Sequence, residues 1–336
     1  MTRRRAGGRR AATAVALVVV VGSLAVAVSG GSAAAGGATP TTPAVTLAAE
    51  HGSGRSPGCG RAPAAADVLP GHDQARTLTV GSVRTTYQLA VPPRYRPDRP
   101  VPLILLFYGF DSDPAQFTTL TGLPDRGAAA GSLVVVPHTH PGELEWQFNG
   151  NGTDAAFVEA LTRHVEDAYC VDPDQVDAVG FSAGAAFTVL YSCAHPGQVA
   201  AIATVAVEFL LGCSHAVPIL SFHGTSDANV PYQDGAVGIS LPGVKVPGTQ
   251  RNMDAWAALD RCRPDPESSR VAAHVVRQRW SGCADGTSVT LYSILGGGHS
   301  WPGADEMLDS TATQEVDATG LILAFFDRHG GPSPTG

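Results

Sequence analysis

The sequence predicts one α/β domain in three layers, a mixed but mostly parallel sheet with helices on both faces. Short apolar runs rich in β-branched residues alternate with segments of helical periodicity, and the later runs are almost continuously apolar. Continuous apolar strands are typical of parallel sheets that are buried on both faces. The chain has 336 residues, and the part from 59 to 330 is within the range of a single large domain.

Eight expected strands follow one another along this domain. The first two have the character of antiparallel edge strands, and the others fit a parallel sheet. Because ligands bind outside the carboxyl ends of the strands in such sheets, the polar residues that follow each strand are the candidates for function. The strands are Arg76–Val80, Thr85–Val91, Pro102–Phe107, Leu133–Val136, Val176–Val179, Ala200–Val205, Val217–Phe222 and Val289–Leu295.

Helical periodicity occurs mainly between the later strands. In the segment Ala155–Tyr169 the apolar residues Phe157, Leu161 and Val165 lie on one stripe. Asp154 directly precedes this segment as the expected N-cap. The other expected helices are Ala183–Ala194, Met253–Leu259 and Thr313–His329.

The first 35 residues have the layout of an export signal. Five arginines precede an uncharged apolar run from Ala11 to Val28, and small residues follow up to Ala35. We expect removal of residues 1–35 by cleavage near Ala33 to Ala35, with an uncleaved membrane anchor as the alternative. The protein would then be secreted, by the general or the twin-arginine route, without stable membrane association after cleavage.

Residues 36–58 are rich in Ala, Gly, Thr and Pro and show no apolar period. This composition predicts a flexible spacer between the signal and the domain at 59–330. The last residues, 331–336, are expected to form a disordered tail. No internal repeat is visible, so one core is expected.

The charge balance argues against nucleic acid as a partner. The formal charge is −8, and a chain without the five leader arginines carries −13, since no acidic residue precedes Ala35. Lys245 is the only lysine, and no basic cluster occurs after the leader. A chain this acidic does not attract phosphate backbones, so we expect no nucleic-acid binding.

Six cysteines in an exported chain predict disulfide bonds, since their spacing matches neither a CxxC redox motif nor a zinc ribbon. We favour the pairing in which two short local loops close and the remaining two cysteines join. The pairs are Cys262 with Cys283, Cys193 with Cys213, and Cys59 with Cys170. Beyond the first pair other connectivities stay open, and buried free thiols are the alternative.

A strand, a tight turn and a helix surround the candidate nucleophile. The segment Gly180-Phe181-Ser182-Ala183-Gly184 follows an apolar strand and leads directly into a helix. This is the context that the GxSxG nucleophile elbow of the α/β-hydrolase fold requires, because a turn so tight needs small residues on both sides of the serine. The strained turn presents the Ser182 hydroxyl above the sheet. A serine that caps an ordinary helix is the alternative.

A serine hydroxyl needs a base within hydrogen-bond reach, and the base needs an acid that orients it. In this fold the chain order is serine, acid, histidine. His299 follows the last strand in the glycine-rich loop GGGHSWPG and is our candidate base. Asp227 follows the preceding expected strand and is our candidate acid, with Asp234, further from the strand end, as its rival. His223 is expected to shape the loop that carries Asp227.

The developing oxyanion needs two backbone N–H donors, one from the residue after the nucleophile and one from a loop after an early strand. Ala183 follows the nucleophile, and Phe110 follows the strand Pro102–Phe107. We therefore assign the two donors to these residues.

The other histidines give no sign of a metal centre. His138 and His140 form an HxH pattern, but no carboxylate or third histidine lies at supporting spacing. We therefore expect no metal and no cofactor.

With these residues together, the chain resembles the secreted polyhydroxybutyrate depolymerase-like esterases, a family that also includes feruloyl and acetylxylan esterases. The resemblance covers about Cys59 to His329. It is strongest at CVDP from Cys170, VGFSAG from Val179, FHGTSD from Phe222 with VPY from Val230, and GGGHSWPG from Gly296. It implies an α/β-hydrolase fold, metal-free ester hydrolysis, and catalytic roles for Ser182, Asp227 and His299.

The resemblance also implies substrate-binding residues. Trp146 and Trp301 are expected to border the cleft, and Tyr108 stands where the family usually has a histidine before the glycine of the oxyanion loop. Ala185 replaces a glycine that often follows the elbow. We therefore expect a secreted serine esterase that acts, through an acyl-enzyme, on a small-molecule, polysaccharide or polyester ester.

Two other functions fit the same sequence. An acyltransferase on this fold would use the identical triad and pass the acyl group to an alcohol. A non-catalytic binding protein would keep the site as a relict, but the intact motifs argue against it. The sequence leaves the oligomeric state open.

Overall fold

The computed structural model describes residues 54–63, 75–238, 241–305 and 309–329. The expected signal peptide, residues 1–35, and the expected tail, residues 331–336, lie outside the described residues. All of the described residues fall in one compact unit. None of the described helices is long and apolar enough to cross a membrane.

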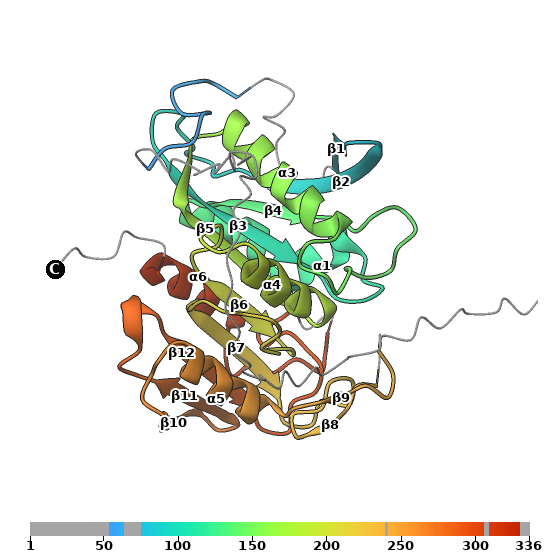
Figure 1. The fold of residues 1–336 in the computed structure, drawn as a ribbon, viewed down its shortest axis with the longest axis vertical. Coiled ribbons are helices and arrows are strands. Elements are labelled where there is room, and N and C mark those ends of the chain that lie inside the picture. The colour runs from blue at the N-terminus through green and yellow to red at the C-terminus, as the bar shows by residue number, and fades with distance from the viewer. Residues whose placement is uncertain (1–53, 64–74, 239–240, 306–308, 330–336) are drawn as a thin grey trace, which may run out of the picture. The chain divides into compact units, whose positions relative to one another are not determined.

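The described residues form a ten-stranded sheet in the order β1-β2-β4-β3-β5-β6-β7-β12-β11-β10 (Figure 1). Neighbouring strands from β4 to β12 run parallel, and the pairings at both edges are antiparallel. The parallel strands are β3 Val101–Phe107, β4 Leu133–Pro137, β5 Val171–Phe181, β6 Ile202–Val205, β7 Ile219–Gly224 and β12 Val289–Ile294. The edge strands are β1 Arg76–Val80, β2 Val83–Ala90, β10 Glu267–Ala272 and β11 Val275–Trp280.

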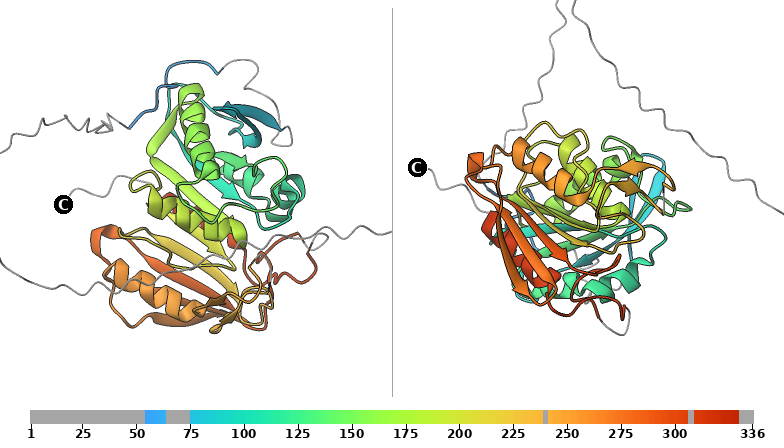
Figure 2. Two further views of the ribbon diagram at one scale, coloured as in Figure 1. Left: turned by 45° about the vertical axis from the view of Figure 1, so that its right-hand side comes forward. Right: turned by 90° about the horizontal axis from the view of Figure 1, so that it is seen from below.

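Helices cover both faces of this sheet, as Figure 2 shows. One face carries α3 Thr153–Ala168, α4 Ala183–Ala194 and α5 Thr249–Leu259. The other carries α2 Leu123–Ala130 and α6 Ala318–His329, with α1 Pro114–Thr121 beside α2. A 3-10 helix, η1 Ala284–Gly286, and a small ribbon of β8 Gly235–Ala236 and β9 Lys245–Val246 lie in the connections. The predicted mostly parallel, three-layered architecture is confirmed.

The central strands form where apolar side chains can be buried on both faces. Every residue of β4, β6 and β7 is buried. The hairpin of β10 and β11 was not expected, because its residues ESSRVA and VVRQRW are largely polar and most stay partly or fully exposed at the sheet edge. A polar edge also disfavours pairing with a further strand from another molecule.

Two helices were missed and one begins later than expected. α1 starts at Pro114 after Asp113, whose carboxylate accepts the N–H of Gln116. Gly122, at φ 59°, ends α1 and starts α2, so neither helix is long enough to show a clear apolar period. The expected helix from Thr313 is helical only from Ala318.

The three disulfide bonds have the favoured pairing, Cys59–Cys170, Cys193–Cys213 and Cys262–Cys283. Residues just before Cys59 also pack on the domain. The Ser56 hydroxyl donates to the carbonyl of Tyr169 at 2.7 Å and accepts the N–H of Val171 at 2.8 Å. Ser56 and Gly58, which lie within the expected spacer 36–58, therefore contact the packed domain.

One carboxylate lies in the core away from the predicted site. Asp177 on β5 is 1% exposed, and its Oδ1 has no hydrogen-bond partner among the described residues. It lines a cavity of about 250 Å³ that Asp327 also borders. Burial raises the pKa of Asp177 well above its ordinary value of 3.8. The folded protein therefore favours the protonated form of Asp177. The stability of the fold falls as rising pH ionises this carboxyl group.

We predict that Asp177→Asn stabilises the protein most at alkaline pH. The free energy of unfolding in urea should exceed that of the natural chain at pH 8 and exceed it by less at pH 4, because the amide cannot ionise. Asp327→Asn, at the exposed rim of the same cavity, is the matched control and should change neither value. A gain that is equal at both pH values would contradict the prediction.

Candidate active site

The nucleophile elbow forms between the end of β5 and the start of α4. Ser182 has φ 55° and ψ −120°, a strained backbone conformation, and its N–H donates to the carbonyl of Val205 on β6 at 2.9 Å. A Cβ on Gly180 would lie 2.2 Å from the carbonyl oxygen of Gly184, and one on Gly184 would lie 2.3 Å from that of Phe107. Only glycine fits at both places, which is why the motif has this form.

Three side chains that are distant in the sequence meet at the carboxyl edge of the sheet. The Nε2 atom of His299 lies 2.8 Å from the Oγ atom of Ser182, and its Nδ1 atom lies 2.7 Å from Oδ2 of Asp227. The hydroxyl is mostly buried and the imidazole is 13% exposed. The arrangement suits proton transfer from the hydroxyl to the imidazole, whose cationic form the carboxylate would stabilise.

Asp227 is held on every side. Its Oδ1 accepts the N–H groups of Asn229 and Val230 at 2.8 and 2.9 Å, while Oδ2 faces the imidazoles of His299 and His223. Burial alone would raise the pKa of Asp227, but the hydrogen bonds from the two histidines hold it below its usual range. The carboxylate is therefore ionised at neutral pH.

The rival acid, Asp234, lies elsewhere. Its carboxylate accepts the N–H of Gly248 at 2.8 Å and pairs with the exposed guanidinium of Arg251. These contacts fix the start of α5. Asp227, and not Asp234, is the acid that contacts His299.

The two expected oxyanion donors flank the serine. A Cβ on Gly109 would lie 3.3 Å from the Cβ of Ser182, so the loop that carries Phe110 passes directly beside the nucleophile. In the described part of the chain, neither the N–H of Phe110 nor that of Ala183 donates to another group. Their role as donors to a developing negative charge stays a prediction.

The three expected substrate-binding side chains are buried in the described part of the chain. Trp146 and Trp301 are each 1% exposed and Tyr108 is 4% exposed. The indole of Trp146 donates to the carbonyl of Tyr108 at 2.9 Å and stacks on Phe187 at 4.9 Å. The indole of Trp301 donates to Thr319 at 3.0 Å. These contacts hold the indole rings against neighbouring protein groups, and the substrate-binding role that the resemblance implied stays a prediction.

The HxH pair is occupied by protein contacts. His138 bonds to the Thr86 hydroxyl at 2.7 Å, and burial lowers its pKa to about 4. His140 pairs with the buried carboxylate of Asp154. The predicted N-cap at Asp154 is wrong, because α3 begins at Thr153 after Gly152 and Asp154 lies inside its first turn. Among the described residues, no group of three or more His, Cys, Asp or Glu side chains could hold a metal ion.

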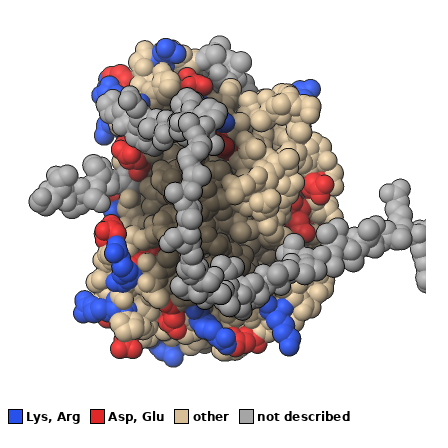
Figure 3. All heavy atoms as spheres, viewed as in Figure 1, with Lys and Arg blue, Asp and Glu red and all other residues tan. Residues whose placement is uncertain are grey.

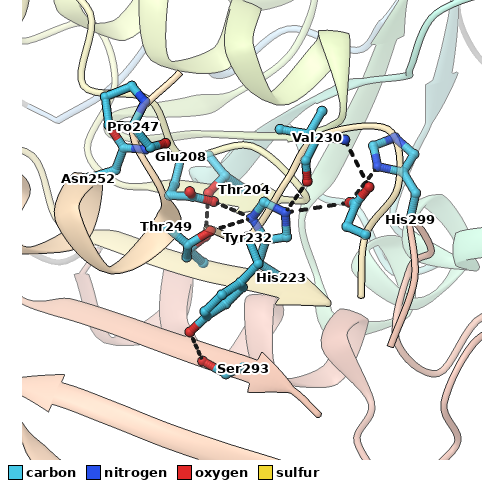
Figure 4. A network of polar contacts seen from close by, with 12 residues as sticks. Thr204, Glu208, His223, Val230, Tyr232, Pro247, Thr249, Asn252, Ser293 and His299 are labelled. Atoms are coloured by element: carbon cyan, nitrogen blue, oxygen red, sulfur yellow. Dashed lines mark hydrogen bonds and ion pairs between the residues drawn. The ribbon is translucent and has the colours of Figure 1, made fainter. Parts of the chain in front are cut away.

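Sequence reasoning missed the buried carboxylate that contacts His223 behind Asp227. Glu208, on the loop after β6, is fully buried and its Oε2 lies 2.8 Å from Nδ1 of His223 (Figure 4). His223 was noticed because it precedes Gly224 in the acid loop. Glu208 follows a different strand, so only the neighbouring positions of β6 and β7 reveal the pair.

Comparison with known proteins supports this architecture. The chain is 26% identical over 274 residues to feruloyl esterase D of Neurospora crassa, which covers 77% of this chain and 85% of that protein. It is 27% identical over 265 residues to feruloyl esterase C of Emericella nidulans, and the match covers 74% of this chain and 84% of that protein. No protein-family model matches the chain.

A solved structure shows the fold. The acetyl xylan esterase from Aspergillus awamori superposes with a TM-score of 0.55 at 11% identity, covering 76% of this chain and 99% of that one. The chain has the α/β-hydrolase fold. The similarity to feruloyl and acetylxylan esterases that the motifs suggested is also confirmed.

We predict that Trp146→Phe lowers stability and turnover but not substrate affinity. Loss of the bond to the Tyr108 carbonyl and of core volume should cost about 2 kcal/mol and loosen the oxyanion loop. With p-nitrophenyl acetate, kcat should fall severalfold while KM stays the same. Trp280→Phe is the control, because Trp280 is equally buried, lies on β11 and makes no indole hydrogen bond to any described residue. A rise in KM alone would contradict this prediction and support a substrate-binding role for Trp146.

Proposed function

We propose that this chain is a secreted carboxylic ester hydrolase that works through Ser182, His299 and Asp227 and a covalent acyl-enzyme. The observation that carries the proposal is the series of hydrogen bonds from Ser182 to His299 and on to Asp227, 2.8 and 2.7 Å long. A free surface serine has no reason to be held in this way. The strained elbow and the two available N–H groups add to the case.

In the first half-reaction the Ser182 oxygen attacks the ester carbonyl while Nε2 of His299 takes its proton. The N–H groups of Phe110 and Ala183 stabilise the negative oxygen of the tetrahedral intermediate. Asp227 accepts the Nδ1 hydrogen of His299, which fixes the tautomer and stabilises the imidazolium. The imidazolium then gives its proton to the leaving alkoxide, and the alcohol departs.

In the second half-reaction water takes the place of the alcohol. His299 removes a proton from the water, which attacks the acyl-serine carbonyl, and the same N–H groups stabilise the second intermediate. Its collapse breaks the bond to Ser182, whose oxygen recovers its proton from His299. The carboxylic acid is released and the enzyme returns to its first state.

The substrates that we favour are feruloyl and acetyl esters of plant polysaccharides. Support comes from the names of the relatives, feruloyl esterases D and C, and of the superposed acetyl xylan esterase. The ring of Phe181 lies 4.9 Å from the imidazole of His299, and Phe110 is also only partly buried. These phenyl rings offer an apolar contact to an aryl or a short acyl group.

The disulfide bonds support secretion, as does the expected signal peptide. All six cysteines are paired in three disulfide bonds. Such bonds persist in oxidising compartments and are reduced in most bacterial and eukaryotic cytosols.

Replacing the nucleophile tests the proposal. Ser182→Ala should lower kcat/KM for p-nitrophenyl acetate at least about a thousandfold, because no covalent intermediate can form, and leave the circular dichroism spectrum unchanged. Ser226→Ala, an exposed serine in the acid loop, is the control and should keep full activity. A Ser182→Ala variant that remains active would refute the assignment, and a natural chain that resists a fluorophosphonate probe would favour a relict site.

A substrate panel tests the finer proposal. Methyl ferulate and acetylated xylan should be cleaved with higher kcat/KM than hydroxybutyrate oligomers or longer acyl esters. Release of free acid and of transferred acyl product should be compared at high alcohol concentration. Preference for hydroxybutyrate oligomers would contradict the substrate assignment, and predominant transfer would identify an acyltransferase.

A further inference from the structure

A second imidazole lies directly behind the acid of the proposed triad. His223 on β7 has a fully buried side chain, as have Glu208 and Asp227 on either side of it. Figure 4 shows the ring of His223 between Glu208 and Val230. Its contacts place it between the carboxylates of Glu208 and Asp227, and Asp227 in turn contacts His299. The ring thus stands in a line of four ionisable groups that leads from the interior to the nucleophile. The protonation state of the His223 ring indicates what it does beyond shaping the loop.

The hydrogen-bond partners of His223 fit a ring that carries two protons. Nε2 lies 3.0 Å from the carbonyl oxygen of Val230, which can only accept, so Nε2 carries a hydrogen. Nδ1 lies 2.8 Å from Oε2 of Glu208, and an ionised carboxylate is also only an acceptor. All contacts are therefore satisfied when the ring is an imidazolium. Burial alone would lower the pKa of His223, but the charges of Glu208 and Asp227 outweigh burial and raise it.

The other groups that face the ring do not compete for this charge. Thr249 at the start of α5 contacts Nδ1 at 2.9 Å with a neutral hydroxyl. The phenol of Tyr232 packs edge-on at 5.6 Å, and its hydroxyl bonds to Ser293 on β12. The charged residues of α5, Arg251 and Asp254, are exposed. Glu208 and Asp227 are thus the charges that hold the cation.

Oδ2 of Asp227 is shared by two imidazoles. His299 lies 2.7 Å and His223 3.4 Å from this one oxygen. A buried carboxylate tends to take up a proton, and a neighbouring cation opposes this. The same cation also opposes protonation of His299, because two positive rings would then flank one carboxylate.

We propose that His223 is a permanent imidazolium, neutralised by Glu208, and that it acts as a positioning residue that keeps Asp227 ionised and oriented and extends the active range of His299 to lower pH. This inference rests on the proposed function for its effect on activity. The charge state itself can be measured without any assay.

The first experiment is nitrogen NMR of the natural chain carrying labelled histidine. The His223 signals, identified by their absence in His223→Gln, should show both ring nitrogens protonated throughout pH 5 to 8. A His223 ring with one bare nitrogen at pH 7 would overturn the proposal. The same spectrum of Ser182→Ala should be unchanged, so a failed esterase assignment would be distinguished from a failed charge assignment.

The second experiment is the pH dependence of kcat/KM in Glu208→Gln. Without the anion, His223 should become neutral and stop opposing the protonation of His299. The acid limb of the profile should then move to higher pH by about 0.5–1 unit. The double variant Glu208→Gln/His223→Gln should show the same shift, because the two side chains act as a unit.

Tyr232→Phe is the matched control, because it removes a hydrogen bond packed against the same ring without changing a charge. It should leave the acid limb in place. A Glu208→Gln profile that coincides with the natural one, with only thermal stability lowered, would assign the pair a purely structural role and overturn the proposal. If neither Glu208 variant folds, the NMR of the natural chain decides the question alone.

Discussion

The parallel pairing of β12 with β7 is the contact on which the site depends. Ile294 stands opposite Gly224 in this register, so the loops that follow the two strands leave the sheet at the same height. There is no room for a side chain between them, since a Cβ on Gly224 would lie 2.3 Å from the carbonyl oxygen of Gly298. Asp227 and His299 can meet because glycines without side chains stand in both loops at this point.

Much of this arrangement could be predicted because it follows from local rules. Continuous apolar runs identify the parallel strands, and the glycines around Ser182 mark the elbow. Position relative to the strand end distinguished Asp227 from Asp234. Edge structure was harder to predict, because β10 and β11 are held by backbone pairing with little apolar signal.

Burial was the property that the sequence could not supply. Trp146 and Trp301 follow strands near the site, where a cleft residue and a packing residue look alike in one dimension. Their indole N–H groups both find acceptors inside the protein, which is what a ring in the core needs. Glu208 was missed for the same reason, since an acidic residue is usually expected in water unless its buried partner is known.

The long disulfide loop has a consequence for how the protein survives proteolysis. Cys59 and Cys170 are 111 residues apart, and the chain between them supplies β1 to β4 and α1 to α3. A protease that cuts once anywhere in this stretch leaves two polypeptides that are still joined by sulfur. Because exposed loop tips are the usual sites of such cuts, the bond lets a nicked molecule keep its pieces together.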